Sequence, residues 1–173
     1  MLTTGTDPAN HERLLVKAVI GANEFPLNSL ITSGRLGGLL DYANDTLEFS
    51  KNSLGRLAIT IADQLNTQNK LGMDAYGSIG GNIFTDINST IFTNQRVIAN
   101  DDNTGLATMT VSIDDTSALT TDNYNMVIDS ANHYIISRVS DNSVVTSGTV
   151  GGLPAQVSLE GFTLTIDTDV SYT

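Results

Sequence analysis

Few residues of this chain have the type and spacing that catalysis or metal binding requires. The acidic stretch Asp101-Asp102-Asn103-Thr104-Gly105 resembles the start of a calcium loop. A complete EF-hand loop needs a bidentate Glu at its twelfth position, and Ser112 occupies that position here. We therefore interpret this stretch as a polar turn and predict no metal site.

Nucleophiles and cofactor-binding loops give no stronger signal. The two histidines, His11 and His133, lie far apart in the sequence and have no H-x-x-x-H spacing, so we expect both at the surface. No G-x-S-x-G motif occurs. The stretch Gly77-Ser78-Ile79-Gly80-Gly81 lacks the Lys-Ser/Thr of a phosphate-binding loop, and we interpret it as a flexible hinge. The sequence predicts no enzyme, no catalytic residue and no cofactor.

The composition excludes further classes of protein. The 173 residues include 8 Lys and Arg against 19 Asp and Glu, so the formal net charge is −11 and nucleic-acid binding is disfavoured. The absence of Cys excludes disulfides and thiolate metal sites. No apolar run approaches the ~20 residues of a membrane-spanning helix. With 40% hydrophobic and 16% charged residues, the chain is expected to fold.

Both ends suggest a piece of a longer protein. The segment 1–5 has neither the basic start nor the apolar centre of a signal peptide. The segment 167–173 stops as though another strand should follow. We expect an excised central piece, with fraying of terminal residues as the alternative.

An apolar stripe with a period of about 3.5 residues runs through 34–71. This spacing is typical of a coiled-coil packing face and predicts one long helix that ends near Gly72. We expect the stripe to pack on partner elements of the same subunit, and a Leu57→Asp substitution to unfold the helical part while sparing the β domain. The stripe consists of Leu36, Leu40, Leu47, Leu54, Leu57, Ile61 and Leu65.

Strands are predicted both before and after this helix in the sequence. The apolar run 14–20 has the length of a strand and ends at Gly21. Beyond the Gly-rich segment 72–91, residues 107–113, 124–129 and 162–167 alternate between apolar and polar side chains, which is typical of half-buried antiparallel strands. Turn residues separate them, and six to eight strands are expected from about 90 onward.

These patterns together predict an α+β fold. Residues 1–85 form a helix-bearing domain with short strands, and residues 86–173 form a mainly antiparallel β domain of sandwich or barrel-like shape. Without further information, a core helix of an ordinary α+β domain explains the stripe as well as an assembly role does.

Several motifs resemble one known family. Residues 34–42, Gly34-Arg35-Leu36-Gly37-Gly38-Leu39-Leu40-Asp41-Tyr42, are similar to the opening of the central helix in the flagellar hook-associated protein 1 family. The blocks 54–58, 61–74 and 80–84, and the pattern of Ser117, Tyr124 and Arg138, follow that family in order. The match covers about 34–142. Ala43 stands where the family often has Arg, and Asn69 where His is usual.

The resemblance implies a structural, secreted protein of the bacterial flagellum that joins hook to filament and supports filament assembly. It implies partners among its own subunits in a ring, the hook protein and filament-side junction proteins, and terminal helices that this chain lacks. The chain alone is then expected to be monomeric, without nucleic acid, membrane or cofactor. An extracellular adhesin or carbohydrate-binding β module is the alternative, although sugar sites favour aromatic platforms and the chain has no Trp. A hydrolase carried on the flagellum has no supporting constellation.

Overall fold

The computed structural model describes residues 1–105 and 107–167, apart from the side chain of Glu12. The expectation about the last residues, 168–173, lies outside this range. Contacts within the chain divide it into two compact units. The first unit contains Met1–Lys51 and Ile98–Asn103, and the second contains Asn52–Val97 and the residues from Thr104 onward.

The first unit is built on a three-stranded antiparallel sheet in the order β1-β2-β3. Its strands are β1 (Leu2–Asp7), β2 (Asn10–Ile20) and β3 (Asn23–Pro26). Gly21, with a φ of +66°, begins the two-residue turn between β2 and β3, so the predicted strand end at Gly21 is confirmed. The side chain of Asn28 accepts a hydrogen bond from Val16 N (2.7 Å) and donates one to Leu14 O (3.0 Å), which fixes the chain beyond β3 to β2.

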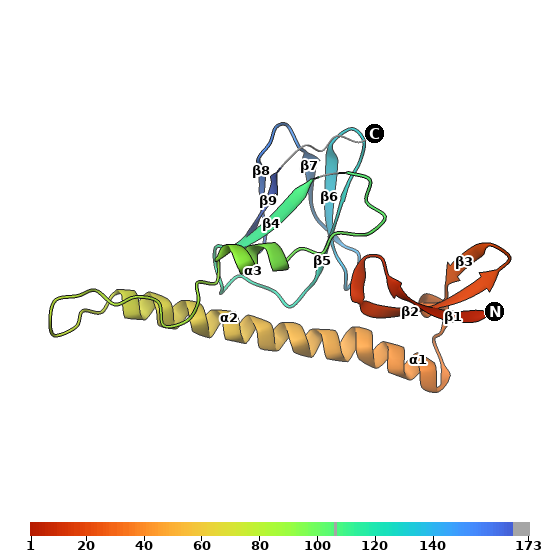
Figure 1. Cartoon of the computed structure of the whole chain (residues 1–173), viewed down its shortest axis with the longest axis horizontal. Coiled ribbons are helices and arrows are strands. Elements are labelled where there is room, and N and C mark those ends of the chain that lie inside the picture. Colours follow the sequence, from red (N-terminus) through yellow and green to blue (C-terminus); the bar gives the residue numbers. More distant parts are fainter. Residues whose placement is uncertain (106, 168–173) are drawn as a thin grey trace. The chain divides into compact units, whose positions relative to one another are not determined.

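A short 3₁₀ helix, Asn28–Leu30, leads to the long helix that the sequence predicts. Its first part is α1 (Gly34–Asp41), its middle is a π-helical turn (Tyr42–Leu47) and its last part is α2 (Glu48–Lys70). Figure 1 shows α1 running into α2 without a break. The helix ends two residues before Gly72, within the accuracy of a helix boundary, so the predicted long helix is confirmed.

The second unit contains a small β-sandwich. Its two antiparallel sheets have the orders β4-β9-β8 and β5-β6-β7. Ile136 of one sheet and Val157, Leu164 and Ile166 of the other are buried together in one core with Val150. The alternation predicted from the sequence is thereby confirmed. The strands are β4 (Thr108–Ile113), β5 (Tyr124–Ile128), β6 (His133–Arg138), β7 (Val144–Thr149), β8 (Ala155–Ser158) and β9 (Phe162–Asp167).

The helix α3 (Thr90–Gln95) is fastened to strand β4 by polar side chains. Arg96 donates hydrogen bonds to Val111 O (2.9 Å) and to Ile87 O, and burial lowers the pKa of its guanidinium. Asn88 bonds both backbone groups of Ile113, accepting from its N–H and donating to its carbonyl, each at 2.8 Å. These contacts place the segment 86–97 within the second unit.

The sequence predicts a boundary between residues 85 and 86, whereas the contacts divide the helix between Lys51 and Asn52. Most of α2, from Asn52 to its end at Lys70, therefore belongs to the same compact unit as the sandwich. Residues 98–103 return to the first unit, where Asp101 N donates a hydrogen bond to Pro8 O at 3.0 Å. The boundary at 85/86 remains a prediction about independent folding.

Candidate assembly surface

The part of α2 within the second unit contacts its surroundings through polar side chains. Asn52 Nδ2 donates to Thr121 O at 2.9 Å. About two turns before the helix ends, Asp63 Oδ2 accepts a hydrogen bond from Thr116 Oγ1 at 3.3 Å. Asn66, in the next turn, is only 5% exposed. The covered face of α2 is therefore its polar face, the reverse of an ordinary surface helix, which buries its apolar face.

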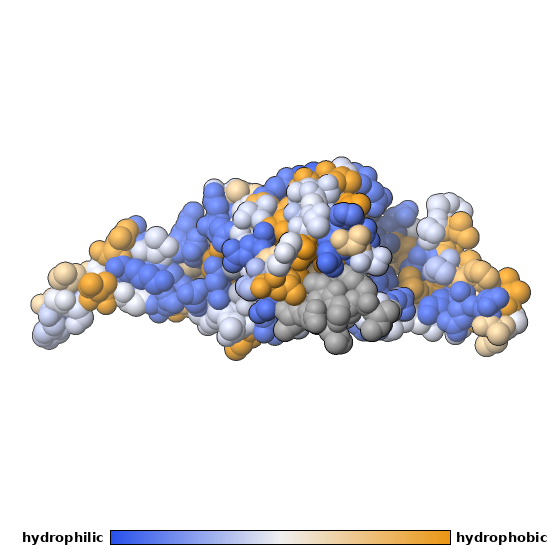
Figure 2. Space-filling model, turned by 90° about the horizontal axis from the view of Figure 1, so that it is seen from above, coloured by the Kyte–Doolittle hydropathy of each residue, from blue (hydrophilic) through white to orange (hydrophobic). Residues whose placement is uncertain are grey.

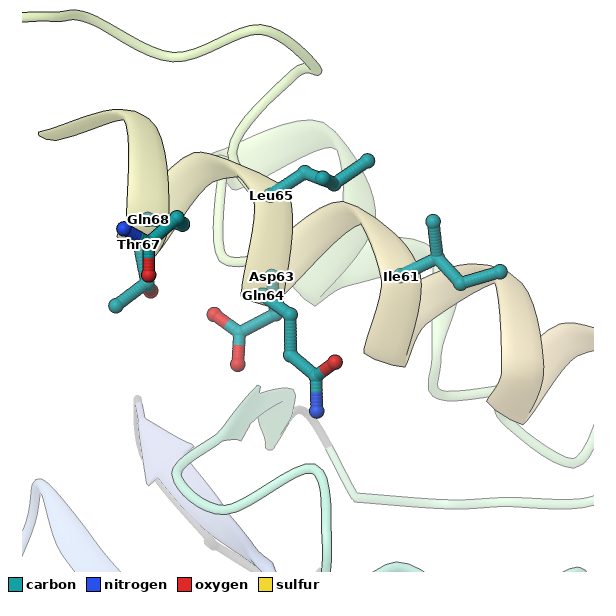
Figure 3. Close-up of a pocket in the computed structure, with 6 residues that line it drawn as sticks. All are labelled: Ile61, Asp63, Gln64, Leu65, Thr67 and Gln68. Atoms are coloured by element: carbon teal, nitrogen blue, oxygen red, sulfur yellow. The ribbon is translucent and has the colours of Figure 1, made fainter. Parts of the chain in front are cut away.

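The apolar stripe lies on the uncovered face of the helix. Leu54 and Leu57 are 68% and 56% exposed, and Ile61 and Leu65 are 46% and 43% exposed. Figure 3 shows Ile61 and Leu65 on one side of α2 and Asp63 and Gln64 on another, around a shallow hollow on the helix surface. Nearer the start of the long helix, Leu36 and Leu47 are also exposed, while Leu40 is half-buried.

None of these seven side chains belongs to the buried core of the described residues. The sequence identifies the stripe but not the direction in which it points. Full burial of one such Leu or Ile contributes about 1.5–3 kcal/mol, so a partner that covered the stripe would gain several such increments. The expectation that the stripe packs on partner elements remains a prediction.

A second apolar surface lies on the sheet of the first unit. The strand register puts Leu2, Leu14 and Phe25 on the same face as Ile20. Leu2 and Phe25 both pair with Ala18, and Leu14, Ala18 and Ile20 are separated by even numbers of residues along β2. Leu2, Leu14 and Ile20 are each between 68% and 69% exposed. Figure 2 shows apolar surface over β1–β3.

The Gly-rich segment after α2 is fastened to the helix, so its interpretation as a flexible hinge is wrong. The side chain of Asn66 accepts hydrogen bonds from Ile83 N and Phe84 N, both at 2.8 Å, and donates to Phe84 O at 3.0 Å. Asn69 Nδ2 donates to Gly81 O at 2.7 Å. The loop closes because an Asn within the helix bonds main-chain groups about 17 residues further along, a contact that local sequence rules do not reveal.

The fastened loop carries its own apolar side chains. Leu71, Met73 and Ile79 are 77%, 69% and 72% exposed, and Tyr76 is 94% exposed. Met73 and Ile79 pair as an isolated antiparallel bridge. The loop is thus a small hairpin that presents apolar groups at the surface, which its Gly-rich sequence does not predict.

A polar network joins parts of the sandwich. Arg138 contacts Asp122 (Nε to Oδ2, 3.2 Å) and Glu160, while the Tyr124 hydroxyl donates to Glu160. Burial, and secondly the hydrogen bond to Glu160, raises the pKa of Tyr124. Each charged group has an opposite charge or a hydroxyl partner. The network is therefore typical of a structural interaction between strands and loops rather than of a catalytic dyad.

The acidic and histidine residues considered for chemistry in the sequence contact single neighbouring side chains. Asp101 lies 3.3 Å from His11 Nε2, and His133 Nδ1 lies 3.2 Å from Asp129. Within the described residues, no three His, Cys, Asp or Glu side chains gather closely enough to hold a metal ion. In the same part of the chain, no helix combines the length and apolar character needed to cross a membrane.

The two halves of the chain match two family models. Residues 1–84 match the model described as "Flagellar hook-associated protein FlgK helical domain", and residues 98–172 match "Flagellar hook-associated protein 1, D2-like domain". These matches define the class, the flagellar hook-associated proteins. Within that class, the chain belongs to the hook-associated protein 1 family, known as FlgK.

Individual relatives agree with this assignment. The chain is 29% identical to flagellar hook-associated protein 1 of Escherichia coli over 143 residues, which are 83% of this chain and 25% of that protein. It is 27% identical to the Salmonella typhimurium protein over 95% of this chain and 28% of that protein. The structure of the flagellar hook junction protein FlgK from Burkholderia pseudomallei matches with a TM-score of 0.80 and 29% identity, over 98% of this chain and 31% of that one.

The chain therefore spans between a quarter and a third of the length of these relatives. The α+β fold and the family resemblance predicted from the sequence are confirmed. The assignment favours a junction role over the adhesin alternative.

Proposed function

We propose that this chain is the helix-bearing and outer β part of a structural protein at the junction between flagellar hook and filament. The family assignment supports this role, and the observation that carries it within the chain is the uncovered apolar stripe on α2. A stripe of this length, turned away from the chain's own core, needs a partner to bury it.

The spacing of the apolar stripe indicates which kind of element covers it. The stripe repeats every three to four residues, which is the spacing for packing against another helix. The relatives contain about three times as much additional chain, in which such helices can lie. We infer that helices of the same subunit cover the stripe and that the subunits form a ring with contacts to hook protein and filament-side junction proteins.

The remaining parts of the proposal follow from the same role. The protein acts outside the cell after export and works mechanically, without catalysis or cofactor. The chain alone is monomeric, since its net charge of −11 opposes self-association.

We expect Leu57→Asp to have different effects in the chain alone and in the complete protein. The sequence alone predicts that this substitution unfolds the helical part, but Leu57 is 56% exposed in the chain alone. We therefore replace that expectation, for the chain alone, by a change in unfolding free energy within about 0.5 kcal/mol. In a full-length protein that carries this segment, the buried charge should abolish junction assembly and motility in a strain lacking its own family member.

Arg56→Asp is the matched control, since Arg56 is an exposed neighbour outside the stripe. Thermal melts, motility assays and electron microscopy of hook ends supply the measurements. Normal motility with Leu57→Asp would contradict the proposed burial of the stripe. Strong, selective binding on a glycan array would favour the adhesin alternative.

A further inference from the structure

The segment 120–124 leads into strand β5 and bonds α2 on one side and the polar network of the sandwich on the other. The two sides alternate along the chain. Asn52 Nδ2, on the helix, donates to Thr121 O at 2.9 Å and to Asn123 Oδ1 at 3.2 Å. The odd-numbered residues of the segment therefore hold the helix.

The even-numbered residues of the segment belong to the polar network. The hydroxyl groups of Thr120 and Tyr124 share a hydrogen bond of 2.7 Å, and Asp122 Oδ2 lies 3.2 Å from Arg138 Nε. Glu160 completes the network, because one of its oxygens accepts from Tyr124 and the other pairs with Arg138. Thr120, Asp122 and Tyr124 are each partly buried, which strengthens such bonds relative to bonds in open water.

The position of the Thr121 carbonyl depends on the residues beside it. Consecutive Cα atoms are only about 3.8 Å apart, so a displacement of Thr120 or Asp122 also displaces Thr121. Asn123 is held separately, because its carbonyl accepts a hydrogen bond from Val139 N at 2.8 Å. The bond between Thr121 and the helix is therefore the contact that the polar network can control.

We propose that segment 120–124 couples α2 to the sandwich, with Tyr124 and Glu160 as positioning residues for the bond between Asn52 and Thr121. The hydroxyl of Tyr124 holds Thr120, and the carboxylate of Glu160 holds that hydroxyl. The network thereby controls a bond of the helix to which it contributes no atom. The coupling does not depend on the junction role, because all of these residues lie in the second unit.

The variant Tyr124→Phe tests the coupling. It removes the hydroxyl and retains the ring that packs edge-on against Phe162, with 5.2 Å between the ring centroids. In the parent chain, Asn52→Ala should lower the midpoint of thermal unfolding by about 3 °C, which is the size expected for a lost hydrogen bond in a chain of this length. In the Tyr124→Phe background it should lower the midpoint by less than about 1 °C, because the bond is already lost.

Asn66→Ala is the matched control, because Asn66 lies on the same helix but bonds the Gly-rich loop. Its effect on the midpoint should be the same in the parent and in Tyr124→Phe. Equal effects of Asn52→Ala in the two backgrounds would overturn the proposal, since two unconnected losses add.

Nuclear magnetic resonance of the side-chain amides gives a local measurement that does not depend on global stability. In Tyr124→Phe and in Glu160→Gln, we expect the side-chain amide of Asn52 to exchange with water at least about threefold faster than in the parent. The side-chain amide of Asn69, which donates to Gly81 O at 2.7 Å, is the internal reference and should not change. An unchanged Asn52 amide in both variants would also overturn the coupling.

Discussion

Asn66 lies within the last turns of α2, and its side chain closes the Gly-rich loop. It is 5% exposed and makes three hydrogen bonds with main-chain groups of Ile83 and Phe84. Its replacement by Ala leaves two N–H groups and one carbonyl without their partner. Loss of such bonds costs roughly 1 kcal/mol each.

We therefore expect Asn66→Ala to lower the free energy of unfolding by about 2–3 kcal/mol in urea titrations. Asn69→Ala is the control, because Asn69 makes one exposed bond to the same loop and should cost under about 1 kcal/mol. Equal effects of the two variants would contradict the assignment of Asn66 as the main fastening of the loop.

Gly80 gives a second test of the loop at the residue scale. A Cβ at position 80 would lie 2.1 Å from Asn69 O, whereas a Cβ at position 81 meets nothing within 4 Å. Gly80→Ala should therefore displace the loop and raise hydrogen exchange at Ile83 and Phe84. Gly81→Ala should leave exchange unchanged and stabilise the chain slightly, because it restricts the unfolded state.

At the scale of elements, the turns of the sandwich depend on ionised aspartates. The hydroxyl and then the main-chain N–H of Ser117 lower the pKa of Asp115, and Ser143 does the same for Asp141. A carboxylate whose pKa is lower in the folded state stabilises the fold above its unfolded pKa. This contribution is lost as the pH falls below about 4 and then through the folded pKa.

We expect the thermal midpoint of the sandwich to fall as the pH drops from 5 to 2. The double variant Asp115→Asn with Asp141→Asn should flatten that dependence, because an amide cannot titrate. Melts at several pH values by circular dichroism measure it. An identical pH dependence of parent and variant would place the acid-sensitive groups elsewhere.

Most of the elements could be predicted from the sequence because their signals are local. Alternation defined β4, β5 and β9, and the 3.5-residue spacing defined the long helix. Turn residues between the strands were equally local signals: the turns at 129–132 and 140–143 each contain an Asn with positive φ, Asn132 at 60° and Asn142 at 57°.

The surroundings of these elements could not be predicted. An apolar helix face normally packs on its own chain, and only the structure shows that α2 is covered on its polar side by bonds such as Asn52 to Thr121. The fastening of the Gly-rich loop depends on Asn66, whose partners are 17 and 18 residues away. The π turn leaves no mark in the spacing of the stripe.

At the scale of the whole molecule, the boundary of the β unit can be measured. The sequence places it at residue 86, but the sandwich bonds to Asn52 and Asp63 of α2. We expect a chain of residues 52–173 to unfold cooperatively at a higher temperature than a chain of residues 86–173. Calorimetry decides between them, and equal midpoints would favour the boundary at 86.

The return of residues 98–103 to the first unit affects how the protein responds to proteases. The hydrogen bond from Asp101 N to Pro8 O and the 3.3 Å contact between Asp101 Oδ1 and His11 Nε2 hold this short segment. A single cleavage between Lys51 and Asn52 would produce two polypeptides, yet each would still supply residues to the first unit. The chain enters the first unit twice, so a single cleavage does not separate the two units into independent polypeptides.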